Sequence, residues 1–181
     1  MIIKKQAFPG KLPALRVARS EQSGLTTINS IVERAVLRWP MSMRVKKHAI
    51  PLLQYDVIDM ASYAFFRSEL GDIIVAAIAL DFEYTSADRF RNELLVHGIY
   101  VDPVAQGRGV GRALLDFAER QAREHNFAGV ALKAERVSRG FFENCGYSHN
   151  APRTSDDYPY FYRKSVRALP IGMRESPLYA R

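Results

Sequence analysis

Cysteine and histidine are scarce in this sequence: its 181 residues contain one cysteine, Cys145, and four histidines. A single cysteine excludes a disulfide within the chain and is typical of a reducing compartment, so we expect the cytoplasm. The cysteine and histidines show no metal-ligand spacing, so we predict no metal site. No apolar stretch reaches the roughly 18 residues of a membrane helix. The first residues lack the apolar core of a signal peptide, so we expect neither membrane insertion nor secretion.

Acidic residues are the scarcer charged class, with 19 against 26 basic residues and a net charge of +7. Such a charge suits polyanionic partners. The basic residues are spread along the chain without a recognition-helix cluster or an aromatic RNA-binding motif, so nucleic acid is not expected and ranks as a distant third reading. A small ligand with several phosphates would use the charge too, and part of it is ordinary solvated surface.

The length suits one domain with a sizeable core. Residues 1–13 contain two prolines and a glycine and predict an N-terminal arm. Residues 14–167 carry the regular patterns and predict a single domain. Residues 168–181 predict a C-terminal tail that is disordered or packs on a partner, and a homodimer is one option for assembly.

The period of apolar residues and the positions of turn residues predict the helices and strands outside the glycine-rich stretch at 106–112. Ser23 is expected to cap an amphipathic helix that Pro40 ends, and Pro51 is expected to interrupt a short helix between residues 41 and 60. Ser138 is expected to cap a short helix that reaches Asn144. The run 73–80 is apolar on both faces, which predicts a central strand. The other strands are expected at 14–19, 63–67, 93–101, 130–134 and 160–166, with a polar loop over 85–92.

A glycine-rich turn between a strand and a helix is the most informative stretch. Pro103 cannot donate to a sheet ladder, so the strand that starts at Glu93 should end before it. An amphipathic helix follows the turn. Glycines at alternate positions let the backbone approach a ligand, and the amides at the helix start form an anion site suited to phosphate. The alternative is a tight turn without ligand. The neighbouring arginines favour phosphate binding by residues Gln106, Gly107, Arg108, Gly109, Val110, Gly111 and Arg112.

The spacing is neither that of the P-loop, which a Lys-Ser/Thr pair closes, nor that of the dinucleotide fingerprint. Gln106, Gly109 and Gly111 form Gln-x-x-Gly-x-Gly, which resembles the acetyl-CoA pyrophosphate loop of the GNAT N-acetyltransferase superfamily. The segment 141–147, Phe-Phe-Glu-Asn-Cys-Gly-Tyr, is similar to that family's Phe-Tyr-x-x-x-Gly-Phe segment. The two motifs lie within 93–147, and the rest of the chain fits by element order alone.

The resemblance implies an α/β (α+β) fold, with a mixed, mostly antiparallel central sheet and helices on both faces. It also implies acetyl-CoA as co-substrate and no metal. In the family, the pantetheine pairs with the backbone of the strand before the glycine turn, here Ile99, Tyr100 and Val101. Ser138 and Phe142 are the further positions that we expect to contact acetyl-CoA.

Acetyl transfer to an amine needs a base for the nucleophile. His97 is the candidate in the right titration range, and a satisfied core histidine is the equally weighted alternative. Some GNAT enzymes have a histidine at this strand position, and others have a glutamate nearby. Glu93 lies four residues earlier, on the same strand face unless a bulge intervenes. The plainer reading of Glu93 is an exposed carboxylate at the strand start.

The departing CoA thiolate needs a proton, and here the sequence departs from the family. The tyrosine often credited with this step falls at Phe142, which has no hydroxyl. Tyr147 is the nearest phenol in sequence and becomes the candidate donor, with Tyr158, Tyr160 and Tyr162 as others. The alternative is that Phe142 has no part in this step and only packs beside Phe141 against the long helix. Many family members also have an asparagine where this chain has Glu135.

Two functions therefore remain from the sequence. The first is an N-acetyltransferase that moves the acetyl group of acetyl-CoA to a primary amine by direct attack in a ternary complex. Its acceptor is a small molecule or a peptide or protein. The second is a non-catalytic acyl-CoA-binding sensor or regulatory domain. His97 favours the enzyme, and Phe142 leaves room for the sensor.

Overall fold

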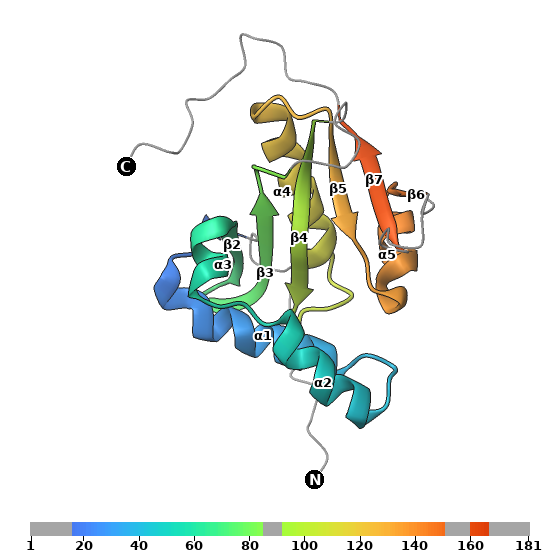
Figure 1. The fold of residues 1–181 in the computed structure, drawn as a ribbon. Coiled ribbons are helices and arrows are strands. Elements are labelled where there is room, and N and C mark those ends of the chain that lie inside the picture. The colour runs from blue at the N-terminus through green and yellow to red at the C-terminus, as the bar shows by residue number, and fades with distance from the viewer. Residues whose placement is uncertain (1–15, 85–91, 151–159, 167–181) are drawn as a thin grey trace. The chain divides into compact units, whose positions relative to one another are not determined.

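The computed structural model describes residues 16–84, 92–150 and 160–166 (Figure 1). The arm at 1–13, most of the loop at 85–92, Tyr158 and the tail at 168–181 lie outside these described residues. The helices are α1 (Leu25–Leu37), α2 (Met43–Leu53), α3 (Val57–Ser62), α4 (Val110–Glu124) and α5 (Arg139–Asn144). The strands are β1 (Arg16–Arg19), β2 (Ala64–Leu70), β3 (Ile73–Asp81), β4 (Glu93–Val101), β5 (Gly129–Lys133), β6 (Ser148–Asn150) and β7 (Phe161–Ser165).

The strands form one seven-stranded sheet in the order β1-β2-β3-β4-β5-β7-β6. β1 and β2 are antiparallel, as are β5 and β7 and also β6 and β7, whereas β4 and β5 are parallel. The predicted α/β class with a mostly antiparallel mixed sheet is confirmed. β3 is an interior strand, as its apolar run predicts, because a strand buried on both faces has no polar side to show to water. The three-residue strand β6 was not predicted, since its sequence, Ser-His-Asn, carries no apolar alternation.

Backbone contacts divide the chain into two units. Unit 1 comprises residues 1–79 and 99–114, and unit 2 comprises residues 80–98 and 115–181. β3, β4 and α4 each run from one unit into the other. The assignment of 14–167 to a single domain therefore stays a prediction.

Unit 1 has a core built on the apolar face of α1. Ile28, Val32 and Val36 are at most 1% exposed and pack with the rings of Tyr55 and Phe65. Their spacing is that of one face of an α-helix, which is why the sequence predicts α1 correctly. α1 also packs against α2 (Figure 1).

The ends of the unit 1 helices differ from expectation in two places. Ser23 does not cap α1, because it lies inside a short 3-10 turn and Gly24 occupies the N-cap without a side-chain bond. Pro51 does not interrupt α2 but sits in its last turn, where it removes only one backbone hydrogen bond. α3 was not predicted. Its start is fixed by a capping box in which Asp56 and Asp59 each bond the other's backbone amide.

Unit 2 has a core between α4 and strands β4, β5 and β7. Leu94, Val130, Leu132 and Tyr162 are at most 1% exposed. The parallel register of β4 and β5 runs without insertion from Glu93↔Gly129 to Val96↔Leu132. β4 extends beyond its last pair with β5, and its end at Val101 is the one that Pro103 predicts.

Candidate active site

The turn after β4, in unit 1, is held by the backbone and side chain of Asp102. The amide of Asp102 donates to the carbonyl of Val75 in β3 at 2.8 Å, and its carbonyl accepts from the amide of Ala105 at 2.8 Å. Its carboxylate oxygen Oδ1 accepts from the amide of Val104 at 3.0 Å. Asp102 is 6% exposed. An aspartate that bonds the amide two residues later is a common way to start a turn, so this residue shapes the loop that follows.

The glycine turn itself opens its backbone to solvent. Gly107 has a φ of 74° and Gly109 a φ of 82°, a region that residues with a Cβ rarely adopt. A Cβ added at either glycine would meet no atom of the described residues within 4 Å, so this side of the turn has open space next to the backbone. Gly111 is different: it lies inside the first turn of α4 and does not have a positive φ.

The first amides of α4 follow directly from this turn. Val110 begins the helix, and the first bond of the ladder runs from the amide of Ala113 to the carbonyl of Gly109 at 3.0 Å. The amides of Val110 and Gly111 precede that bond, so they have no acceptor inside the helix. Amides of this kind, at the positive end of a helix dipole, are an arrangement that suits an anion. Residues 106, 107, 109 and 112 are exposed and residue 108 is half-buried, so the turn is accessible to a ligand.

Two residues that are predicted to bind acetyl-CoA, one in the turn and one just before it, have contacts within unit 1. The side-chain amide of Gln106 donates to the carbonyl of Val101 at 3.0 Å, which closes the loop back onto the end of β4. Tyr100 contributes a ring whose centroid is 6.3 Å from that of Tyr55. Ile99, Tyr100 and Val101 are all half-buried. This end of the strand is therefore neither fully packed in the core nor fully open to solvent.

The two candidate bases lie on β4 in unit 2 and have opposite surroundings. His97 is exposed. Glu93 is 7% exposed, and its Oε2 lies 2.8 Å from Nε of Arg163. The pair is close, but neither atom has the alignment of a hydrogen bond, so we describe it as an ion pair. The expectation that Glu93 is an exposed carboxylate is wrong, because the neighbouring guanidinium allows the charge to be buried.

Tyr147, the candidate proton donor, lies in a buried polar cluster of unit 2. It is 2% exposed, and its hydroxyl donates to Oε1 of Glu119 at 3.4 Å. Lys164 Nζ lies 2.7 Å from the same oxygen and donates to the carbonyl of Cys145 at 3.0 Å. Burial, and after it the charge of Glu119, raises the pKa of Tyr147 above the ordinary tyrosine value. Tyr147 therefore stays protonated, with its hydroxyl directed at α4.

Phe142 and Ser138, on α5 and just before it, are also held by internal contacts. Phe142 is 4% exposed, and its ring lies 5.1 Å from that of Phe141 and 6.3 Å from that of Tyr147, between centroids. Ser138 stands at the N-cap of α5 as predicted, but its hydroxyl donates to the carbonyl of Glu135 at 2.9 Å instead of accepting from α5. The reason is local: the residue continues a 3-10 turn, so its side chain points back along the chain.

Comparison with known proteins agrees with these motifs. A family model described as the acetyltransferase (GNAT) family matches residues 29–147. This protein belongs to the GNAT family. No curated protein matches the sequence significantly.

Solved GNAT structures share the fold at low sequence identity. The PaiA N-acetyltransferase of Thermoplasma acidophilum, solved in complex with coenzyme A, has a TM-score of 0.68 at 13% identity, over 85% of this chain and 100% of that chain. A GNAT family acetyltransferase of Brucella melitensis, in complex with acetyl-CoA, has a TM-score of 0.59 at 16% identity, over 87% and 92%. The ribosomal-protein-S18-alanine N-acetyltransferase of Escherichia coli has a TM-score of 0.57 at 18% identity, over 88% and 99%.

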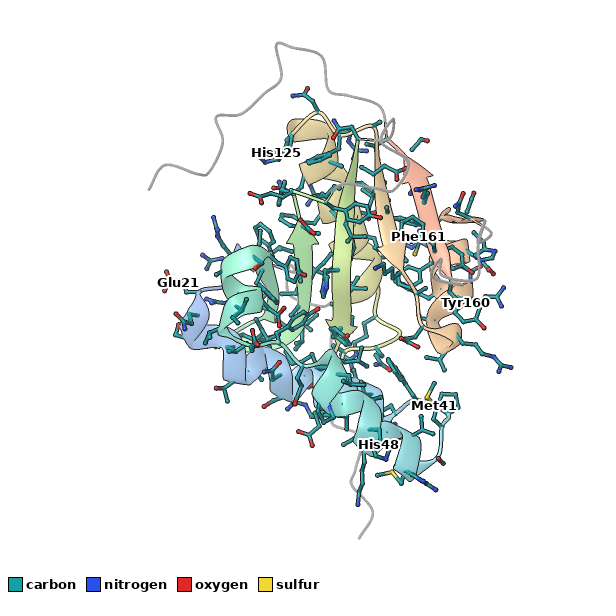
Figure 2. The ribbon with its side chains drawn as sticks, viewed as in Figure 1. Glu21, Met41, His48, His125, Tyr160 and Phe161 are labelled. Carbon is teal, nitrogen blue, oxygen red and sulfur yellow. The ribbon has the colours of Figure 1, made fainter. Side chains whose placement is uncertain are left out.

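The segment from the end of α1 into α2 varies in exposure along its length. Trp39 is half-buried and packs against the unit 1 core. Met43 is 53% exposed. Figure 2 shows Met41 on the segment that precedes α2 and His48 on α2 itself, and His48 is exposed. The segment thus combines one core aromatic with side chains that solvent or a ligand reaches.

Sequence reasoning missed one contact at the glycine turn. Nε of Arg34, on α1, lies 2.6 Å from Oδ2 of Asp102. Arg34 falls on the polar side of α1, where an arginine is ordinarily a solvated residue, and its partner is 68 positions away. Nothing in the local pattern could have indicated this pair.

Among the described residues, no group of three or more histidine, cysteine, aspartate or glutamate residues is arranged to hold a metal ion. None of the helices in the described ranges combines the length and hydropathy that crossing a membrane requires.

Proposed function

We propose that this GNAT protein is an acetyl-CoA-dependent N-acetyltransferase that acetylates a primary amine of a small molecule, peptide or protein. The observation that carries the proposal is the open glycine turn. Gly107 and Gly109 leave the backbone uncovered on one side, and the amides that start α4 lie next to it. A pyrophosphate is the ligand that such a turn fits, because several N–H donors and a helix dipole meet at one small surface.

The binding residues follow from this placement. Gln106, Gly107, Arg108, Gly109, Val110, Gly111 and Arg112 would hold the pyrophosphate, and the backbone of Ile99, Tyr100 and Val101 would hold the pantetheine. The two arginines add charge that does not depend on pH. Ser138 and Phe142 remain proposed contacts of lower rank, because internal contacts occupy both side chains. The bound thioester would supply the acetyl group.

His97 is our proposed base, which takes a proton from the acceptor amine directly or through water. Its exposure makes it reachable, and imidazole is the side chain that most often serves as a general base. Glu93 ranks second, because it is already paired with Arg163 and largely buried. A base of this kind is worth about 10²–10⁴ in rate. Attack then occurs in a ternary complex of protein, acetyl-CoA and amine.

The proton donor to the thiolate is the weaker part of the proposal. Tyr147 has the protonated hydroxyl that the role needs, but that hydroxyl bonds Glu119 and the residue is buried. Phe142 supplies no hydroxyl at all. These two observations favour the second candidate function, a non-catalytic acyl-CoA-binding sensor. A single cysteine is typical of the cytoplasm, where we place either function.

The test has two arms. Acetyl-CoA at about 100 times its dissociation constant should stabilise the protein by about 2.7 kcal/mol, seen as a rise in melting temperature. A panel of small amines and peptides, with free thiol as readout, should then reveal turnover. Stabilisation without turnover on any acceptor would support the sensor, and no stabilisation by acetyl-CoA or CoA would refute both functions.

A further inference from the structure

We infer that Arg34 is a positioning residue for the acetyl-CoA turn, and that it acts through Asp102. The inference rests on the proposed function of that turn. Its observation is one residue, Asp102, that joins three parts of unit 1 through its carboxylate and its backbone amide. Oδ2 of Asp102 lies 2.6 Å from Nε of Arg34 on α1, and Oδ1 accepts from the amide of Val104 at 3.0 Å. The amide of the same residue is bound to β3 through the carbonyl of Val75.

Arg34 stands on a helix whose backbone is well fixed, and from there it holds the carboxylate. It stands in the last turn of α1, between residues that are buried in the unit 1 core: Val32 and Val36 are each 0% exposed. The C-terminus of α1 is fixed as well, since Lys46 Nζ donates to the carbonyl of Leu37 at 2.8 Å. The guanidinium therefore reaches Asp102 from a fixed backbone. The side chain of Arg34 is 47% exposed, whereas that of Asp102 is 9% exposed.

This difference in burial decides what the pair does. Removing Arg34 would leave a largely buried carboxylate without its cation, next to a turn meant for a pyrophosphate. A negative charge at that place opposes the ligand, and a carboxylate free to rotate would no longer keep Val104 and the glycines in one arrangement. Both effects act on acetyl-CoA binding. The catalytic step at β4 does not depend on Arg34, so kcat should be retained while KM for acetyl-CoA rises.

The test is calorimetric titration of acetyl-CoA into the full-length protein and its variants. Arg34→Ala should raise the dissociation constant about 5- to 20-fold. Arg38→Ala is the matched control, since it removes the same charge from the exposed residue that follows α1. That control should bind as wild type does. Arg34→Gln, which keeps a donor but loses the charge, gives a second variant if Arg34→Ala folds poorly.

A double variant separates positioning from general destabilisation. Asp102→Asn keeps an oxygen for the Val104 amide but removes the charge. In the Arg34→Ala background it should therefore recover at least part of the lost affinity, a non-additive result that two independent structural defects would not give. Melting temperatures of the unliganded variants are measured beside the titrations.

Three results have distinct meanings. Failure of the wild type to bind acetyl-CoA overturns the proposed function itself. A wild type that binds, with Arg34→Ala and Arg34→Gln equal to it in affinity, overturns the inference alone. A lower melting temperature with unchanged affinity also overturns it, because Arg34 would then be structural only.

Discussion

The two segments that carry the GNAT motifs have opposite physical characters. In the glycine turn of unit 1, binding capacity belongs to the backbone, which Gly107 and Gly109 leave uncovered. In the α5–β6 corner of unit 2, the motif side chains Phe142 and Tyr147 are at most 4% exposed and satisfied by internal contacts. One motif match thus lies in an exposed turn at a helix start, and the other lies in a packed core. Similarity in sequence alone does not distinguish them.

The comparison predicts its largest effect on acetyl-CoA affinity at Gly109. Gly109→Asp should reduce acetyl-CoA affinity at least about 100-fold, because it puts a side chain and a negative charge where the pyrophosphate binds, in backbone that disfavours a Cβ. Gly71→Asp is the matched control: Gly71 also has a positive φ, of 63°, and open space around it, but lies in the β2–β3 turn. Titration of both variants should show normal affinity in the control. Equal losses in the two would mean that strain, not the site, explains the effect.

His97 tests the proposed base on β4, the strand that precedes the glycine turn. His97→Ala should lower kcat/KM by about 10²–10⁴, the usual contribution of a positioned base, and leave the acetyl-CoA dissociation constant close to that of wild type. His149→Ala removes another exposed histidine of unit 2 and should have little effect. The measurement is kcat/KM against pH for both. A variant whose pH profile matches the wild type excludes His97 as base and directs attention to Glu93.

Glu119 tests the claim that the α5–β6 corner is structural. Glu119→Ala removes the shared partner of Tyr147 and Lys164, so the free energy of unfolding should fall by about 2–3 kcal/mol. Acetyl-CoA affinity, measured below the melting temperature, should not change. Glu124→Ala, on the exposed side of the same helix, should cost much less. Normal stability of Glu119→Ala would show that the cluster does not hold this corner together.

Substitution of Phe142 has the smallest expected effect. It distinguishes a ring that only packs in the core from a position that lacks the proton donor for the thiolate. The observed packing places the added hydroxyl of Phe142→Tyr among the rings of Phe141, Tyr147 and Tyr162. We therefore expect a loss of about 1–2 kcal/mol in stability and no gain in kcat. Phe141→Tyr, whose parent ring is 38% exposed, should be nearly neutral. A higher kcat for Phe142→Tyr would instead mean that the position faces the departing thiolate and lacks its proton donor.

The sequence by itself determined those features that depend on neighbours along the chain. The period of apolar residues fixed α1 and α4, Pro103 ended β4, and the alternate glycines indicated the turn before α4, because each rests on local sterics or one face of one element. Short elements with weak local signals, such as α3 and β6, were not predicted. The cap expected at Ser23 failed because a 3-10 turn extends the start of α1.

Only the tertiary structure decided what each polar or aromatic side chain contacts. Glu93 is buried because Arg163 reaches it from β7, and Tyr147 bonds Glu119 across 28 positions of sequence. Arg34 meets Asp102 from a different helix. Such pairs form when distant segments pack, and the burial that sets their charge state is a property of that packing. Such packing cannot be predicted from the pattern of neighbouring residues along the chain.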